Sequence, residues 1–244
     1  METAEVTDAQ IQIGECCEEI EAQVISRLGL KPVPEYQSLS SIKNLQGRAT
    51  GYARVYRGEV IEKAAFLTLN FMPGMCYFNV HLIPRACYRI PRFSFEGMLT
   101  PQGSQISMDL YPDMDIMLNL EYFRSHYKRA ADTYTRARFD SSALVTEPSR
   151  MLHMRAFASP YMLLAYGVKE AQVAEFCGYA QAYLQDWMDL CSASQICSEG
   201  EVEDRIRRRE LIMRTIIECD PDREKVVMLY GEAVTEQIEQ ATML

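Results

Sequence analysis

Polar residues that could do acid–base chemistry alternate with apolar residues near the middle of the chain. Asn79 and His81 lie on the same face of a predicted strand at residues 77–84, because successive side chains point to opposite faces. If that strand forms a hairpin with residues 91–96, Asn79 lies opposite Glu96. A carboxyl group held beside an amide in this way could give a proton to a bound substrate.

A third predicted strand, at residues 104–111, extends this polar face. The turn signal at residues 100–103 sets its register, and Ser107 then falls beside Glu96. The shared face would carry Asn79, His81, Glu96 and Ser107. A polar sheet face commonly meets solvent, so a wet face without function stays an open alternative. The long helices predicted around these strands favour a covered face instead.

The composition is that of an ordinary globular protein. The 244 residues are 48% hydrophobic and 24% charged, so we expect a single domain over residues 1–244. A net charge of −9 disfavours general nucleic-acid binding, which needs a basic surface. No apolar run approaches the length of a membrane span, and the acidic N-terminus lacks a secretory signal. We therefore predict a cytoplasmic protein, or one of the plastid stroma if a transit peptide has been removed.

The sequence lacks the common signatures of metal, nucleotide and serine-hydrolase sites. Its eight cysteines include no CxxC pair, and its three histidines are far apart. It contains no P-loop, no GxGxxG and no GxSxG motif. We expect no metal site and mostly reduced, half-buried thiols.

The order of the predicted elements indicates the fold class. A helix at residues 7–28 precedes about five strands, and further helices follow them. The strands are predicted at residues 48–56, 59–70, 77–84, 91–96 and 104–111, and the later helices at 114–139, 169–191, 202–217 and 222–241, with an irregular stretch at 140–161. Strands joined by short turns pair antiparallel. The sequence therefore predicts an α/β fold, a three-layer α/β/α sandwich with a central antiparallel sheet.

Three groups of residues resemble a known family in their order and spacing. They are Asn79, Pro84, Pro91, Phe93, Glu96, Asp109, Leu110 and Pro112 on the strands, the segment 157–160, and Asp220, Pro221, Arg223 and residues 230–233 near the end. Together they resemble the ferredoxin-dependent bilin reductases over most of the chain from the third strand onward.

This resemblance implies both an activity and a site. The family binds a linear tetrapyrrole, such as biliverdin IXα, between the sheet and the C-terminal helices and reduces it to a phytobilin. Electrons come singly from reduced ferredoxin, the protein supplies protons, and no redox cofactor is bound. The resemblance assigns the catalytic positions to Asn79, Glu96 and Asp220. His81 would be a second possible donor, or a substrate contact.

The substrate's propionates need cationic or hydroxyl partners. We expect these from Ser107, Arg150 and Arg155. Ferredoxin is acidic, so docking needs a local basic patch. Two arginine groups are candidates: Arg85, Arg89 and Arg92 near the sheet, and Arg205, Arg207, Arg208 and Arg209 on a helix. A solvated helix face paired with glutamates is the alternative for the second group.

The chain departs from the family pattern at one catalytic position. Glu96 stands where an Asp is usual, and a Glu there resembles red chlorophyll catabolite reductase, a sister family. Asn79 resembles the phytochromobilin and phycoerythrobilin types, because the phycocyanobilin type has His there. We therefore expect a divergent bilin reductase. A red chlorophyll catabolite reductase-like enzyme, a bilin-binding protein without turnover and an interaction protein that has lost the ligand remain the alternatives. Asp220 could also simply cap the last helix.

Overall fold

The computed structural model describes residues 7–72, 74–140 and 145–243. Its elements follow in the order α1 (Asp8–Leu28), β1 (Lys31–Pro32), the 3₁₀ helix η1 (Pro34–Ser40), β2 (Ile42–Lys43), β3 (Ala49–Arg57), β4 (Ile61–Met72), β5 (Met75–Pro84), β6 (Arg92–Leu99), β7 (Ser104–Tyr111), α2 (Leu120–Thr135), the π-helical η2 (Arg136–Asp140), α3 (Met154–Phe157), β8 (Leu163–Val168), α4 (Glu170–Ser192), α5 (Glu199–Cys219), α6 (Arg223–Tyr230) and α7 (Glu232–Thr242).

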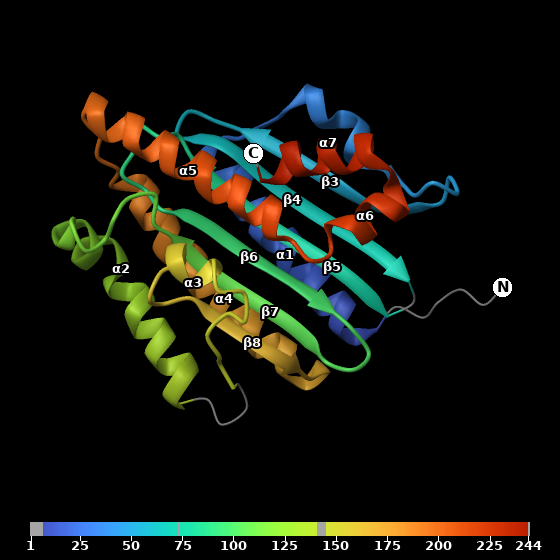
Figure 1. Cartoon of the computed structure of the whole chain (residues 1–244). Helices are drawn as coiled ribbons and strands as arrows, with labels where there is room; N and C mark the ends of the chain where they lie inside the picture. The colour runs from blue at the N-terminus through green and yellow to red at the C-terminus, as the bar shows by residue number, and fades with distance from the viewer. Residues whose placement is uncertain (1–6, 73, 141–144, 244) are drawn as a thin grey trace.

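A central antiparallel sheet of eight strands forms the middle layer. Its strands lie in the order β1-β3-β4-β5-β6-β7-β8, and β2 pairs with the edge of β3. Figure 1 shows α5, α6 and α7 over one face of the sheet and α1 and α4 behind the other. This is the α/β/α sandwich that the sequence predicts, with a sheet larger than the five strands expected.

The first helix begins and ends where its sequence signals indicate. Thr7 is the N-cap, and its side chain and that of Gln10 form a capping box. Gly29 ends the helix in the left-handed conformation, with a φ of 59°. The buried face of α1, including Ile20, then joins one large core with α4 and the sheet. Trp187 of α4 is fully buried there and donates a hydrogen bond from Nε1 to the Pro91 carbonyl at 2.8 Å.

The predicted register of the central strands is confirmed. Asn79 pairs with Glu96, His81 with Ser94, and Glu96 with Ser107. This register puts the polar residues of three neighbouring strands side by side on one face.

Strand alternation separates the two faces of the sheet. Phe78 and Phe95 point into the core beneath α1 and α4, with ring centroids 4.9 Å apart. Asn79 and Glu96, the next residues along each strand, point to the face that α5, α6 and α7 cover. The wet-face alternative is therefore wrong, because helices cover the polar face.

The helix predicted at residues 114–139 begins later than expected. The Asp115 carboxylate accepts the backbone N–H groups of Met117 and Leu118, which holds a turn before α2. A short polar side chain that bonds its own backbone competes with the helix.

Strand β8 is absent from the sequence prediction. It is short and lacks the run of β-branched residues that marks a strand. In addition, Gly167 near its end has a φ of 68°, which is not typical of a strand. The described residues of the predicted irregular stretch at 140–161 include the end of η2, an isolated bridge at Thr146 and the short helix α3, whereas residues 141–144 lie outside the described residues.

The helix predicted at residues 222–241 is two helices, α6 and α7. Gly231 separates them with a φ of 81°, which a residue with a side chain rarely adopts. The N-cap of α6 is Asp222, so the alternative in which Asp220 caps the last helix is wrong. Asp220 is the C-cap of α5, and its carboxylate accepts the backbone N–H of Asp222 at 2.9 Å. This bond turns the chain from α5 into α6.

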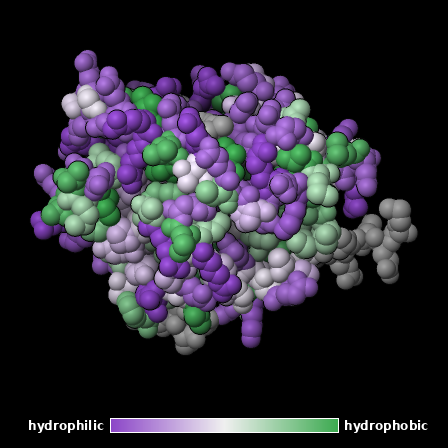
Figure 2. Space-filling model, viewed as in Figure 1, coloured by the Kyte–Doolittle hydropathy of each residue, from purple (hydrophilic) through white to green (hydrophobic). Residues whose placement is uncertain are grey.

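The outer surface is mainly polar on the face that α5, α6 and α7 form. Figure 2 shows hydrophilic residues over most of this face, with hydrophobic residues between them. Among the helices that the structure describes, none is long and apolar enough to cross a membrane.

Candidate functional site

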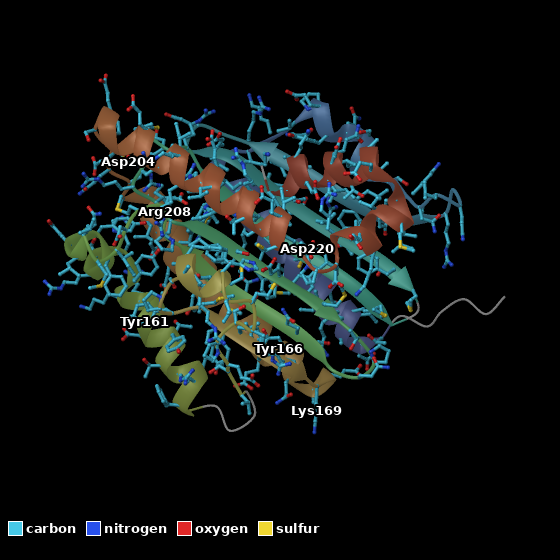
Figure 3. The ribbon with its side chains drawn as sticks, in the orientation of Figure 1. Tyr161, Tyr166, Lys169, Asp204, Arg208 and Asp220 are labelled. Carbon is cyan, nitrogen blue, oxygen red and sulfur yellow. The ribbon has the colours of Figure 1, made fainter. Side chains whose placement is uncertain are left out.

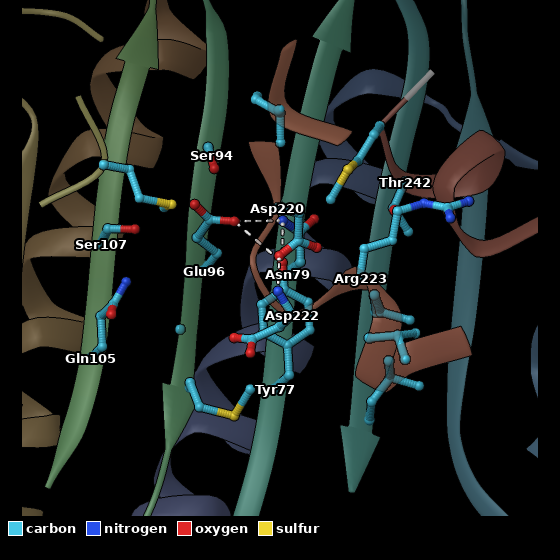
Figure 4. A pocket seen from close by; sticks show the side chains of 18 of the residues that line it. Tyr77, Asn79, Ser94, Glu96, Gln105, Ser107, Asp220, Asp222, Arg223 and Thr242 are labelled. Atoms are coloured by element: carbon cyan, nitrogen blue, oxygen red, sulfur yellow. Dashed lines mark hydrogen bonds between the residues drawn. The ribbon is translucent and has the colours of Figure 1, made fainter. Parts of the chain in front are cut away.

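A cavity of about 650 Å³ lies between the polar face of the sheet and the C-terminal helices. Strands β5, β6 and β7 form its floor, and the ends of α5, α6 and α7 and the loop before α3 form its walls. Figure 4 shows the side chains of the floor and of the helical wall facing each other across this space. The cavity therefore covers the polar patch that the sequence predicts.

A hydrogen-bonded cluster of three side chains occupies the floor. Glu96 Oε2 accepts hydrogen bonds from Asn79 Nδ2 at 3.1 Å and from the Tyr77 hydroxyl at 3.3 Å (Figure 4). Asn79 Nδ2 also donates to the Tyr77 oxygen at 3.4 Å. Each member bonds the other two, so the position of the carboxyl group is fixed.

The surroundings of Glu96 favour its protonated form. Burial raises the pKa of this carboxyl group, and the negative charge of Asp220 raises it further. Hydrogen bonds from Asn79, Tyr77 and Ser107 stabilise the ionised form and oppose part of that rise, but the pKa stays above its ordinary value. A carboxyl group of this kind can both give up a proton and take one back.

Tyr77 is a site residue that the sequence analysis missed. It lies two residues before Asn79 and so shares its face of β5, which strand alternation alone could have indicated. Burial and the neighbouring Glu96 carboxylate raise its pKa well above the ordinary value. Tyr77 therefore stays a neutral hydroxyl that donates to Glu96.

Asp220 reaches the cavity from the helical side. It follows the last residue of α5 and lines the cavity together with Asp222. Burial, which is partial here, raises its pKa, and its charge acts on both Glu96 and Tyr77. The fold thus brings Asn79, Glu96 and Asp220 to one cavity from two separate parts of the chain.

His81 lines the cavity, but its ring is neutral and its N–H is already used in a hydrogen bond. Its Nδ1 lies 2.9 Å from the Thr242 carbonyl oxygen, which can only accept, so Nδ1 carries the hydrogen. Burial and the positive charge of Arg92 lower the pKa of His81 to about 3, so the ring is neutral. Its Nε2 is buried and has no hydrogen-bond partner among the described residues. This geometry does not support His81 as a second proton donor and leaves it as an acceptor.

Two of the three expected propionate partners, Ser107 and Arg150, line the cavity. The Arg150 guanidinium stacks over the Tyr166 ring, 3.9 Å from its centroid. Arg155 is not among the described residues of the lining, and its Nε donates to the Ser149 carbonyl at 2.5 Å.

Arg223 is a further cation in the cavity wall, which the sequence analysis named only as part of a motif. Its guanidinium pairs with Glu239 and Glu232, each at 2.7 Å. Both carboxylates belong to α7, so Arg223 ties α6 to α7 beside the cavity.

Neither predicted arginine group forms a free basic patch. Arg92, Arg205 and Arg209 are buried. The remaining arginines bond to nearby acceptors: Arg85 to the Gly58 and Glu59 carbonyls, Arg89 to Glu201, Arg207 to Asp204 and Arg208 to the Pro112 carbonyl. The sequence could not indicate this burial, because a run of charges on a helix usually faces solvent.

Within the described part of the chain, no group of three or more His, Cys, Asp or Glu residues could hold a metal ion.

The fold is similar to that of phytochromobilin synthase from tomato, whose crystal structure was determined in complex with biliverdin. The match has a TM-score of 0.78 and covers 93% of this chain and 80% of that chain, at 16% sequence identity. No family model and no curated protein sequence matches the chain. At this identity the likeness establishes the fold.

Proposed function

We propose that the cavity binds a linear tetrapyrrole, such as biliverdin IXα, and that the protein reduces it with electrons from ferredoxin. The observation that carries this proposal is the Glu96 carboxyl group, whose pKa lies above its ordinary value and which Asn79 and Tyr77 hold at the floor of the cavity. The volume of about 650 Å³ lies within the roughly 300–1,000 Å³ typical of small-molecule sites. The fold of a protein that binds biliverdin supports the choice of ligand.

The chemistry assigns separate tasks to the two carboxyl groups. Two electrons and two protons saturate one double bond of the pigment. Each electron makes the pigment more basic, so a nearby acid can protonate it. Glu96 gives one proton, and Asn79, Tyr77 and Ser107 then stabilise its carboxylate. Asp220, at the exposed end of α5, gives the second proton from the helical side.

The wall residues orient the ligand. Arg150 and Ser107 bind propionates in this proposal, while Arg155 acts only by holding the Ser149 loop. Electrons come singly from ferredoxin, so the intermediates are radicals and no redox cofactor needs to be bound. Arg85 and Arg207 are the exposed arginines of the two predicted groups, and docking would use them in competition with their present partners, the Gly58 and Glu59 carbonyls and Asp204.

Glu96 also supports a second candidate function. Its side chain is one methylene longer than the Asp usual in bilin reductases, which moves the carboxyl further into the cavity. A red chlorophyll catabolite reductase-like activity on a related open tetrapyrrole fits that difference. A pigment carrier without turnover needs the cavity but not the acid.

An anaerobic absorbance time course tests the proposal. The protein is mixed with biliverdin, ferredoxin and a ferredoxin-reducing system, and chromatography identifies the product. We expect a bound-pigment spectrum that changes to that of a reduced bilin. Binding without change would point to red chlorophyll catabolite or to a carrier, and the absence of binding would reject the proposed ligand.

The variant Glu96→Gln removes the acid and leaves the shape of the cavity nearly unchanged, so it tests the role of the acid alone. It should bind the pigment and reduce it roughly 10²-fold more slowly, the usual loss for a missing general acid. Glu21→Gln is the matched control, because Glu21 is a buried carboxylate on α1 bonded to Tyr56 at 2.7 Å and Arg54 at 2.8 Å, outside the cavity. Equal turnover by Glu96→Gln and the control would show that Glu96 is not the donor.

A further inference from the structure

Three arginines surround one carboxylate where the start of β6 and the segment after β7 meet α5. Arg92 Nε donates to Asp113 Oδ1 at 2.7 Å, and Arg209 Nε donates to Asp113 Oδ2 at 2.5 Å. Arg205 Nη2 lies 3.6 Å from the same Oδ2 and donates to the Ile90 carbonyl at 2.9 Å. We call Arg92, Asp113, Arg205 and Arg209 the arginine cluster. Arg92 and Arg205 are each 1% exposed, and Asp113 is also 1% exposed.

The arginine cluster holds more positive than negative charge. Among the described residues, the carboxylates paired with its arginines are Asp113 and Glu62. Glu62 neutralises little of the positive charge, because its side chain is 57% exposed and its Oε2 lies 3.4 Å from Arg209 Nη1. Even with Glu62 counted in full, the three arginines exceed the two carboxylates by one positive charge. A buried charge without a partner is strongly unfavourable.

The arginine cluster also has unused hydrogen-bond donors. Four nitrogen atoms are buried without a close hydrogen-bond partner in the described part of the chain: Arg92 Nη2, Arg205 Nε, Arg205 Nη1 and Arg209 Nη2. The Tyr122 hydroxyl, also buried, lies beside Arg205 and can take at most one of these donors. A guanidinium group uses its donors best on an anion. Unmatched charge and unused donors thus occur on the same side chains.

We propose that the arginine cluster binds one monovalent anion of halide size, such as chloride. A single negative charge matches the excess. The near-complete burial of Arg92 and Arg205 excludes a ligand of many atoms. A water molecule could satisfy the donors but would leave the charge uncompensated. None of the four residues lines the tetrapyrrole cavity, so the site is separate from the proposed active site.

The position of this site gives it a structural role. Arg92 belongs to β6, whereas Arg205 and Arg209 belong to α5, so the anion joins the sheet to that helix. In Figure 3, Arg208 lies near the middle of α5 and Asp220 at its C-terminal end. The anion therefore helps to hold the helix that carries Asp220 over the cavity.

A bromide experiment tests the site directly. Crystals of the full chain are grown in sodium bromide, and an anomalous difference map is calculated. We expect a peak within contact distance of Arg92 and Arg205. In solution, Tm is measured in sodium bromide and sodium gluconate at equal ionic strength. We expect a saturable rise of roughly 3 °C at about ten times the Kd of bromide. A map without this peak, or equal Tm values in the two salts, would overturn the proposal.

Two variants and a control make the solution test specific. Arg205→Met removes one charge and two unused donors, and should abolish the bromide response. Asp113→Asn removes the competing carboxylate and should lower the Kd of bromide roughly tenfold. Arg54→Met is the control, because Arg54 also has a buried unpartnered Nε but lies outside the arginine cluster, paired with Glu21. A bromide response that persists in Arg205→Met would overturn the proposal.

Discussion

Glu96 and Asp113 are both enclosed carboxyl groups beside the same sheet, yet their pKa values move in opposite directions. Burial raises the pKa of Glu96, and its neighbours are neutral donors and the carboxylate of Asp220. Burial acts to raise the pKa of Asp113 as well. Arg92, Arg209 and Arg205 outweigh this effect and lower it.

The difference shows that neighbours, and not burial alone, determine what a buried acid can do. Among the described residues, the hydrogen-bond partners of Glu96 include no cation, so its pKa stays raised and the carboxyl group keeps its proton to a higher pH than usual. Asp113 is fixed as an anion by the arginine cluster and cannot act as an acid at neutral pH. One carboxyl group is suited to chemistry and the other to holding helix α5 on the sheet.

Removing the carboxylate of Asp113 should have the largest effect on stability. Asp113→Ala leaves three buried arginines without their central anion, and we expect a loss of about 3–5 kcal/mol in the free energy of unfolding. Urea denaturation measures this loss. Asp204→Ala is the control, because Asp204 pairs with Arg207 at 3.0 Å on the exposed surface and should cost only about 0–1 kcal/mol. Similar losses in the two variants would show that Asp113 is not the centre of the arginine cluster.

A second carboxylate beside Glu96 should raise the pKa of Glu96 further and so widen its difference from Asp113. Asn79→Asp replaces a donor that lies 3.1 Å from Glu96 Oε2 with a like charge. The pKa of Glu96 should then rise by roughly one unit or more. If Glu96 is the donor, the pH at which the reduction rate is half-maximal moves up by the same amount. Single-turnover rates measured across pH give this midpoint. Asn70→Asp, at an exposed position on β4, is the control and should leave it unchanged.

The sequence was sufficient to predict the floor of the cavity. Strand alternation and the turn positions fix the pairing of Asn79 with Glu96 and of Glu96 with Ser107, because a slip of one residue would bury the polar face. The same rules put Tyr77 on that face, although it was not recognised as a site residue.

The arginine cluster and the helical wall could not be predicted in the same way. Arg205 and Asp113 belong to distant segments, and only the packing of α5 on the sheet brings them together. Local pattern also fails where the chain bonds to itself, as at Asp115, or bends at a single glycine, as at Gly231. These features depend on tertiary contacts and single backbone conformations, which periodicity does not record.

The two acids should make opposite contributions to stability as pH changes. The folded-state pKa of Glu96 is raised, so its contribution is complete below its ordinary pKa and is lost as pH rises through the folded value. The pKa of Asp113 is lowered, so its contribution is present above the ordinary value of about 3.8 and is lost as pH falls through the folded value. Urea denaturation of wild type and Glu96→Gln between about pH 4 and pH 8 tests the first sign. The variant should gain stability relative to wild type as pH rises, and a gain as pH falls would contradict the assignment.

The smallest effect is expected from Tyr77→Phe, which removes one donor and keeps the ring. The lost bond, 3.3 Å long, stabilises the ionised form of Glu96 by an amount typical of a single hydrogen bond, about 0.5–1.5 kcal/mol. The pKa of Glu96 should therefore rise by less than in Asn79→Asp, because no charge is added. The midpoint of the rate profile should move up slightly while pigment binding is unchanged. A downward shift would mean that the Tyr77 hydroxyl accepts a hydrogen bond from protonated Glu96 instead of donating one to its carboxylate.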